Sequence, residues 1–389
     1  MKTIFSRADA GSNQFKGIRA ALKTDAVLQE LTKSPLTLNI MTLVYQKFSL
    51  EQISRMPLAE RRKDLFDRYI ERMFSRRKTN IKDSSSPKYD LSYQETLSQK
   101  WLIWLALNME NHSQTIFLIE RIQPNWLPSK KDKLLYSLLF SLSFGGIGGL
   151  LIGIIVWLTI GILFPMIWGF FLAASLALFY ALIGSIWAGL TIGKVSCEIE
   201  PLETLNWSIK NLSKSIIGGG VAGLLIYKFT NMNVFLIVGL LIGIIFGIEG
   251  PNLEKTMIPN EGIWQSLKNT IFFSIIGVVG LGIPAAFQTK ELLSIVTNSS
   301  TLQNQISNIN LVISGIIAGL FFGFTKAGIA CLQHFVLRII TYLTQCTPWN
   351  YAHFLNYATE RIFLQKVGGG YIFIHRSLRE HFANLRSNL

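Results

Sequence analysis

The stretch LLYSLLFSLSFGGIGGLLIGIIVWLTIGILF (134–164) decides the fold of this chain, because its 31 residues carry no charged side chain. The next run, PMIWGFFLAASLALFYALIGSIWAGLTIG (165–193), carries none either. A membrane-spanning helix needs about 20 apolar residues, since each residue adds about 1.5 Å and the hydrocarbon core is about 30 Å thick. Both runs are too long and too apolar for core helices of a water-soluble domain, and they predict a membrane domain.

Four weaker apolar stretches follow and predict about six spans over residues 134–335, with four spans as the alternative. They are Ser215–Phe229, Val234–Ile248, Ile271–Phe287 and Leu311–Phe324. Residues 134–335 contain eight Lys, seven Glu and neither Arg nor Asp, so most of the net charge of +14 lies in the flanks. A basic flank beside a membrane block favours the cytoplasmic side of the inner (plasma) membrane and its anionic lipids.

The membrane block also contains a short internal repeat and many glycines. PLETLNWSIKN (201–211) aligns without a gap with PNEGIWQSLKN (259–269), which suggests a duplicated unit of one amphipathic surface segment and two spans. GGIGG (145–149) and the i, i+4, i+8 series Gly239, Gly243 and Gly247 predict close helix–helix contacts in lipid. The two strongest spans contain no ionisable side chain, which argues against a proton-coupled transporter.

The N-terminal flank, residues 1–133, predicts a helical region outside the membrane. Ser34-Pro35 is typical of an N-cap followed by a first-turn proline. RRKDLFDRYIERMFSRRK (61–78) predicts an amphipathic helix. Residues 95–127 predict a further helix with the short apolar tail TIFLIE. Lys130, Lys131 and Lys133 at the membrane edge predict that this flank is cytoplasmic.

The C-terminal flank, residues 336–389, predicts a compact module after an amphipathic exit helix (331–345). PWNYAHFLNYATERI (348–362) reads as a helix, FLQKVGGGYIFIH (363–375) as two strands around a glycine turn, and SLREHFANL (377–385) as a helix. This order fits the end of a winged-helix fold. Each flank alone leaves an apolar stripe exposed to water, which costs a free energy of about 25 cal/mol for each Å² of that stripe. An even number of spans would return the chain to its starting side, so we expect the two flanks to form one domain.

Taken together, the flanks resemble the region behind the nucleotide-binding core of NACHT-type NTPases of the STAND class. The resemblance rests on KSPLTLNIMTLVYQ (33–46), LFDRYIERMFSRR (65–77), TIFLIERIQPNWL (115–127) and GGGYIFIHRSLREHFANL (368–385). The last of these resembles the family's winged-helix pattern F-x-H-x-x-x-x-E-[FYH]-x-A. A glycine-rich membrane block between such flanks is similar to bacterial, especially cyanobacterial, NACHT proteins, and the chain looks like the C-terminal part of one.

The resemblance implies two nucleotide-contacting residues, Pro35 against the adenine and His375 against the phosphate. Helix initiation and a partly buried place in the wing are the simpler roles of these two residues. Glu380 is expected to hold the wing together. A phosphate loop of the form G-x-x-x-x-G-K-[ST] is missing, because Gly193-Lys194 is followed by Val195. The sequence shows no catalytic or metal-binding constellation. Binding of ATP or ADP with Mg²⁺ is expected only if a separately encoded NACHT core is supplied. The chain itself is not expected to be an enzyme.

These observations predict a mainly α-helical protein with a polytopic membrane domain inserted into a cytoplasmic domain. The expected function is a membrane-anchored signalling or switch module. The alternatives are a channel or effector gated by the flanks, and a small transporter. The expected partners are the lipid bilayer, the separate NACHT core and further copies of the chain in a homo-oligomer, with no specific nucleic acid.

Overall fold

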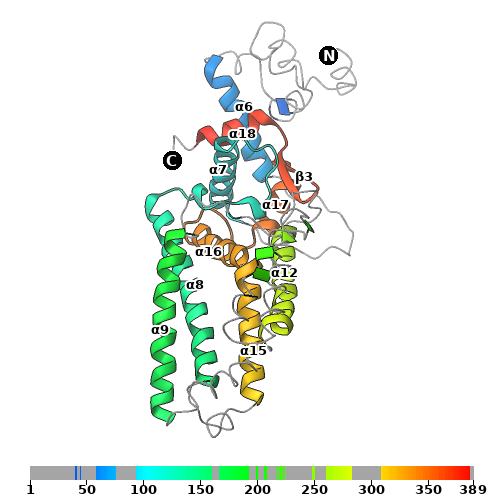
Figure 1. The fold of residues 1–389 in the computed structure, drawn as a ribbon. Coiled ribbons are helices and arrows are strands. Elements are labelled where there is room, and N and C mark those ends of the chain that lie inside the picture. Colours follow the sequence, from blue (N-terminus) through cyan, green and yellow to red (C-terminus); the bar gives the residue numbers. More distant parts are fainter. Residues whose placement is uncertain are drawn as a thin grey trace, which may run out of the picture. The chain divides into compact units, whose positions relative to one another are not determined.

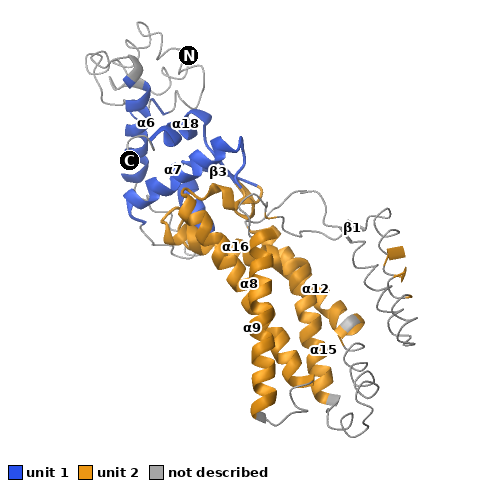
Figure 2. Ribbon diagram, turned by 60° about the vertical axis from the view of Figure 1, so that its left-hand side comes forward, with its two compact units in different colours: residues 1–117, 350–367, 371–389 blue, residues 118–349, 368–370 orange. Residues whose placement is uncertain are grey.

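The computed structural model describes residues 58–75, 93–159, 166–191, 260–282 and 308–385, together with short pieces at 40–41, 44, 199, 206–207, 217–218, 220–221, 224 and 248–249. Over these residues the chain is mainly helical, as predicted. It divides into two compact units (Figure 2). Unit 1 contains residues 1–117, 350–367 and 371–389, and unit 2 contains residues 118–349 and 368–370. Most of each flank therefore belongs to unit 1, whereas the flank residues 118–133 and 336–349 belong to unit 2 together with the apolar block.

In unit 1, helix α6 (Leu58–Ser75) is amphipathic, as the sequence predicts. Its acidic first turn and basic last turn complement the helix dipole. The side chains of the predicted apolar stripe are all buried, namely those of Leu65, Phe66, Tyr69, Ile70, Met73 and Phe74. The Tyr69 hydroxyl donates a hydrogen bond of 2.8 Å to the carbonyl oxygen of Ile362, so the stripe faces the C-terminal part of the chain.

Helix α7 (Glu95–Asn111) is buried over most of its surface, including Trp101, Leu102 and Leu105. The helix stops at Asn111, where His112 caps it and Ser113 takes a positive φ of 52°. The apolar tail that follows is not helical up to Leu118. It then forms two short 3-10 turns, η2 (Ile119–Arg121) and η3 (Pro124–Trp126). The prediction of one helix with an apolar tail is therefore correct only for its first part.

The C-terminal flank has the predicted order of helix, hairpin and helix. Its elements are α17 (Tyr351–Glu360), β3 (Leu364–Val367), β4 (Gly370–Phe373) and α18 (Arg376–Asn384). Asn350 caps α17 by accepting a hydrogen bond of 3.2 Å from the His353 amide. Gly368 in the hairpin turn has a φ of 59°, which a glycine adopts without strain.

The two flanks fold against each other, as predicted. Phe117 and Tyr371 exchange two backbone hydrogen bonds, with N···O distances of 2.8 and 2.9 Å. Helix α18 contacts both α7 and α6. The Arg361 guanidinium donates to the carbonyl oxygens of Met73, at 2.9 Å, and of Phe74, and so satisfies two carbonyls at the end of α6. Unit 1 is thus assembled from both sides of the inserted block.

Unit 2 contains the long apolar helices (Figure 1). They are α8 (Lys130–Thr159), α9 (Met166–Thr191), α12 (Glu261–Gly277), α15 (Asn308–Gly323) and α16 (Ile329–Leu343). A π-helical turn, η5 (Val278–Gly282), extends α12, and another, η6 (Phe324–Gly328), joins α15 to α16. Among the described residues three helices are long and apolar enough to cross a membrane: Lys130–Thr159, Ile167–Thr191 and Ile309–Leu343.

The two strongest predicted spans are confirmed as continuous apolar helices, α8 and α9. The predicted span Leu311–Phe324 and the predicted exit helix 331–345 correspond to α15 and α16, which η6 joins into one continuous helix. Part of the predicted span Ile271–Phe287 is helical in α12 and η5. Ser215–Phe229 and Val234–Ile248 lie almost entirely outside the described residues, so six spans remain a prediction.

The two copies of the internal repeat differ where the structure describes both. In the first copy, Asn206–Trp207 forms strand β1, which pairs antiparallel with β2 (Ile248–Glu249). Ile248, predicted to end a span, therefore lies in a strand. The aligned residues of the second copy, Trp264 and Gln265, are helical in α12. The duplication stays a prediction, and these positions do not share a conformation.

Glycines bring the helices of unit 2 into close contact. A Cβ atom at Gly149 of α8 would lie 2.5 Å from the carbonyl oxygen of Ala177 in α9. A Cβ atom at Gly319 of α15 would lie 2.2 Å from the backbone nitrogen of Val278 in η5. Both distances are too short for any larger residue, so the backbones touch there. The close contact predicted from GGIGG is confirmed, while Gly239, Gly243 and Gly247 lie outside the part of the chain that the structure describes.

Candidate functional site

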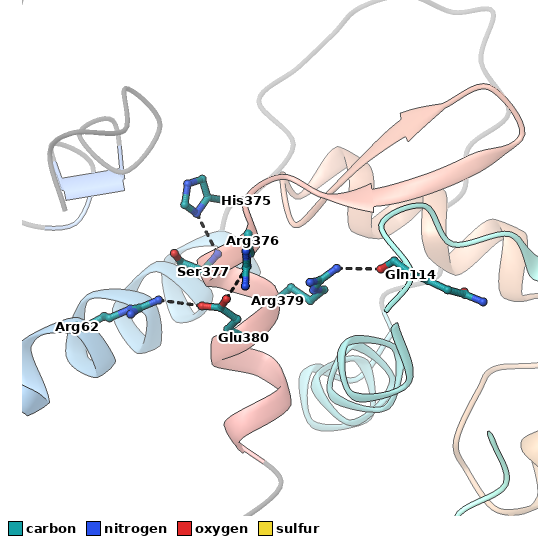
Figure 3. Close-up of polar contacts among 7 residues, drawn as sticks. All are labelled: Arg62, Gln114, His375, Arg376, Ser377, Arg379 and Glu380. Carbon is teal, nitrogen blue, oxygen red and sulfur yellow. Dashed lines mark hydrogen bonds and ion pairs between the residues drawn. The ribbon is translucent and has the colours of Figure 1, made fainter. Parts of the chain in front are cut away.

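His375 is the predicted site residue that the structure describes, and it starts helix α18 (Figure 3). Its backbone is extended, and its Nδ1 atom accepts a hydrogen bond of 3.1 Å from the amide of Ser377. The imidazole therefore acts as an N-cap, a place that Ser, Thr, Asp or Asn usually takes. Because Nδ1 is the acceptor, a neutral ring carries its proton on Nε2. The side chain of Arg376, the next residue, is largely exposed.

Pro35, the second predicted site residue, lies outside the described residues. The expectation that Pro35 and His375 face one nucleotide pocket is therefore still a prediction. Among the residues that the structure does describe, no group of three His, Cys, Asp or Glu side chains is arranged to hold a metal ion.

Glu380 joins α18 to α6, while its expected role in holding a wing together stays a prediction. Its Oε1 atom accepts from Arg376 Nε at 2.8 Å, and its Oε2 atom accepts from Arg62 Nη2 at 3.1 Å (Figure 3). Both arginines are solvent-exposed, and exposed ion pairs contribute at most about 1 kcal/mol each. The contact of Glu380 with Arg62 is therefore a weak, solvent-exposed link between the two helices.

His381 makes a second link between α18 and α6. Its Nε2 atom lies 2.8 Å from Asp67 Oδ1, and its ring lies 5.4 Å from the ring of Phe66. Burial lowers the pKa of His381 below its usual 6.5, and the neighbouring Lys63 and Arg62 act in the same direction. The hydrogen bond to Asp67 opposes this shift. Burial is the largest of these effects, so the folded unit favours the neutral imidazole.

The five residues of the signature F-x-H-x-x-x-x-E-[FYH]-x-A have structural roles in this module. Phe373 and Ala383 are buried, and the Phe373 ring lies 5.9 Å from that of Phe382. His375 caps α18, while Glu380 and His381 bind α6. The signature residues of this chain therefore fix α18 at its start, in its core and on its outer face. Sequence reasoning expected this of Glu380 alone, because the partners Arg62 and Asp67 are more than three hundred residues away in the sequence.

On the other side of α18, one side-chain contact ties the module to the segment after α7, and another lies within the module. Arg379 Nη1 donates a hydrogen bond of 2.9 Å to the carbonyl oxygen of Gln114 (Figure 3). The Tyr371 hydroxyl donates at 2.8 Å to Asn356 Oδ1, and burial raises the pKa of Tyr371 to about 12. Helix α18 is thus held between α6 and the end of α7, both from the N-terminal flank.

A polar cluster in unit 2 was not predicted. The Glu120 side chain is fully buried, and its Oε2 atom accepts from the amide of Asn260, at the start of α12, at 3.3 Å. His334 Nε2 lies 3.0 Å from the carbonyl oxygen of Ile119. Gln123 exchanges two hydrogen bonds with the backbone of Ile199, at 2.7 and 3.1 Å. The first two contacts tie the η2 segment to α12 and α16, and the third ties the residue before η3 to Ile199. The lone Glu in the apolar tail TIFLIE was the available signal.

Comparison of the chain with protein-family models, with curated proteins and with solved structures finds no match. The resemblance to NACHT proteins therefore rests on the sequence motifs alone.

Proposed function

We propose that this chain is a membrane-anchored switch module, in which unit 1 responds to a signal and unit 2 holds it in a bilayer. The observation that carries this proposal is the assembly of unit 1 from both flanks. The chain leaves unit 1 at Phe117 and returns to it at Asn350, so both ends of the membrane block are attached to one folded body. A rearrangement of α18 against α6 and α7 changes both attachments at once.

The nature of the contacts between α18 and its neighbours supports a switch. Three of them are polar or ionic side-chain contacts with N···O distances near 3 Å, made by Glu380, His381 and Arg379. Such contacts are sensitive to charge, whereas an apolar core is not. The proposal identifies the helix–hairpin–helix module as a winged-helix end, and assigns His375 the contact with a nucleotide phosphate that the NACHT resemblance implies.

In this proposal hydrolysis belongs to a separately encoded NACHT core, which would supply ATP or ADP with Mg²⁺. A phosphoryl-transfer site works through a phosphate loop and a metal-binding acid, and this chain has no phosphate-loop motif. The inner membrane, with both termini in the cytoplasm, is the proposed location, and further copies of the chain are proposed partners.

The test is coupling between the units, measured by hydrogen exchange of the full chain in lipid nanodiscs. Asp67→Ala and Arg62→Ala loosen the α18–α6 contact, and the proposal expects faster amide exchange at the ends of α8 and α16 as well as in α18. Lys366→Ala, in the exposed part of β3, is the matched control and leaves exchange unchanged. Faster exchange in α18 alone would contradict a switch that acts on the membrane block.

A further inference from the structure

The described charged side chains of unit 2 lie at one end of its helices. Helix α8 is charged only in its first turn, and α9 carries no charge. The rings of Phe144 in α8 and Phe324 in η6 lie 5.9 Å apart. Cys331 Sγ in α16 lies 3.7 Å from the carbonyl oxygen of Ile263 in α12. Helix α8 and the start of α12 therefore lie beside the η6–α16 segment. We call this end, with its cations, the basic end. Its described cations are Lys130, Lys131, Lys133, Arg121, Lys268, Lys326 and Arg338, and they outnumber its described carboxylates, Glu120, Asp132 and Glu261.

At the basic end, helix α16 buries the apolar Val336, Leu337 and Ile340, yet it also exposes large apolar side chains on another face. Its buried side chains include the polar Gln333, His334 and Thr341. Its exposed side chains include Phe335, Tyr342 and Leu343, and Leu343 is 65% exposed. Exposed apolar surface is unfavourable in water and favourable in the headgroup–acyl boundary of a bilayer. The exposed side chains Phe335, Tyr342 and Leu343 therefore suit contact with lipid better than contact with water.

One cation is held in place on this face. Arg338 Nε donates at 3.0 Å to the carbonyl oxygen of Trp349, its Nη2 donates to the same oxygen, and its guanidinium lies 5.5 Å from the centre of the Trp349 ring. The Tyr342 and Trp349 rings meet edge to face at 5.7 Å. A guanidinium has five N–H donors in a planar fork that matches phosphate, so Arg338 keeps donors beyond the two used here.

We propose that the basic end binds the headgroup phosphate of anionic glycerophospholipids, with Arg338 as the positioned cation and Tyr342 and Trp349 in the headgroup layer. This inference rests on the proposed membrane location of unit 2. Cations beside exposed aromatic and aliphatic side chains suit a ligand that is anionic at one end and apolar at the other. Trp and Tyr are also the residues enriched at membrane–water interfaces. A lipid meets both demands, whereas a soluble phosphate meets only the first.

The test uses the full chain in nanodiscs of neutral phosphatidylcholine with increasing phosphatidylglycerol, followed by native mass spectrometry of the lipids that remain bound. The expected result is selective retention of phosphatidylglycerol, with affinity about fivefold lower for Arg338→Gln, the size expected for one interfacial cation. Arg338→Lys keeps most of the binding. Lys366→Gln in β3 of unit 1 is the matched control and changes nothing.

Several outcomes would overturn the inference. Equal retention of the two lipids would contradict the inference. So would an Arg338→Gln variant that binds phosphatidylglycerol as tightly as the wild type does. Competition by millimolar glycerol 3-phosphate would show a site for free phosphate and not for a lipid. If Arg338→Gln fails to fold, Trp349→Ala, which removes the ring, must weaken retention, or the proposal fails. Loss of the chain from vesicles in an alkaline carbonate wash would instead disprove the membrane location, whereas a retained chain without lipid preference disproves this inference alone.

Discussion

Phe117 and Tyr371 exchange both of their backbone hydrogen bonds, and through this pair the two ends of the chain become one structure. Phe117 lies six residues after the end of α7, and Tyr371 lies in β4. Both side chains are fully buried, so the pair also contributes to the core of unit 1. The stability of unit 1 therefore depends on this closure, which Tyr371 extends through its hydroxyl to Asn356.

The Tyr371 hydroxyl is expected to make unit 1 sensitive to alkaline pH. Its pKa in the folded state is about 12, above the unfolded value of 10, so the folded state keeps its proton longer. Stability from this group is complete below pH 10 and falls as the pH rises from 10 to 12. Tyr371→Phe is expected to lose about 1 kcal/mol at neutral pH, since Asn356 loses its donor, and to depend less on pH above 10. Denaturation by urea at several pH values would measure both effects, and a steeper alkaline loss in the Phe variant would contradict the assignment.

Replacement of His375 tests its role as a helix cap. His375→Ala removes the acceptor for the Ser377 amide and is expected to destabilise unit 1 by about 1 kcal/mol, with faster amide exchange in the first turn of α18. His375→Asp supplies another N-cap acceptor and is expected to restore the slow exchange. If Asp fails to restore it while the variant remains folded, the imidazole has a role other than capping.

The lowered pKa of His381 is expected to make unit 1 less stable in mild acid. Its pKa is lowered in the folded state, mainly by burial, so the unfolded state takes up a proton first. As the pH falls below about 6.5, the unfolded value, unit 1 is expected to become less stable until the folded group also protonates. His381→Gln keeps a donor toward Asp67 and does not titrate. Urea midpoints at pH 7.5 and pH 5.5 should therefore differ less in this variant than in the wild type.

Gly149 and Gly146 form a matched pair for testing helix contacts in unit 2. Gly149→Leu places a side chain against the backbone of α9. It is expected to lower the free energy of unfolding of the detergent-solubilised chain by several kcal/mol, or to prevent folding. A Cβ atom at Gly146 meets nothing within 4 Å, so Gly146→Leu is expected to be nearly neutral. Equal sensitivity at the two positions would show that the α8–α9 contact is not as close as described.

Membrane topology follows from the same closure of unit 1. Since residues 117 and 371 are hydrogen-bonded neighbours, they lie on one side of any bilayer that unit 2 crosses. Reporter fusions after residues 120 and 370 should give the same cytoplasmic signal, because Lys130, Lys131 and Lys133 precede α8. Opposite signals at the two sites would be incompatible with an intact unit 1 in the membrane-bound protein.

Local patterns in the sequence predicted the elements whose residues determine them. The stripe of α6, the hairpin around Gly368 and the apolar helices α8 and α9 depend on short-range periodicity and composition. The end of α7 and the joining of α15 to α16 depend on distant partners. Phe117, six residues after α7, pairs with Tyr371, and η6 packs against α12 while it keeps the backbone helical between α15 and α16.

The candidate site divides in the same way. His375 and Glu380 were found because the signature around them is local, although the capping role of His375 was not predicted. Asp67, Arg62 and Gln114 were missed because each meets α18 only after the chain has folded. Glu120 was missed for the same reason, since the amide that it accepts from belongs to Asn260.

The assembly of unit 1 from both flanks sets the order of events during synthesis. Helix α6 exposes its apolar stripe until Ile362 and Phe363 arrive, because these later residues cover Tyr69 and Phe74. At roughly 5–20 residues per second, translation of the intervening membrane block takes roughly 10–50 s. During that time the N-terminal helices must be shielded from aggregation by a chaperone or by the membrane surface. A block inserted with an odd number of spans would leave α18 across the bilayer from α6, so completion of unit 1 reports that the chain has crossed the bilayer an even number of times.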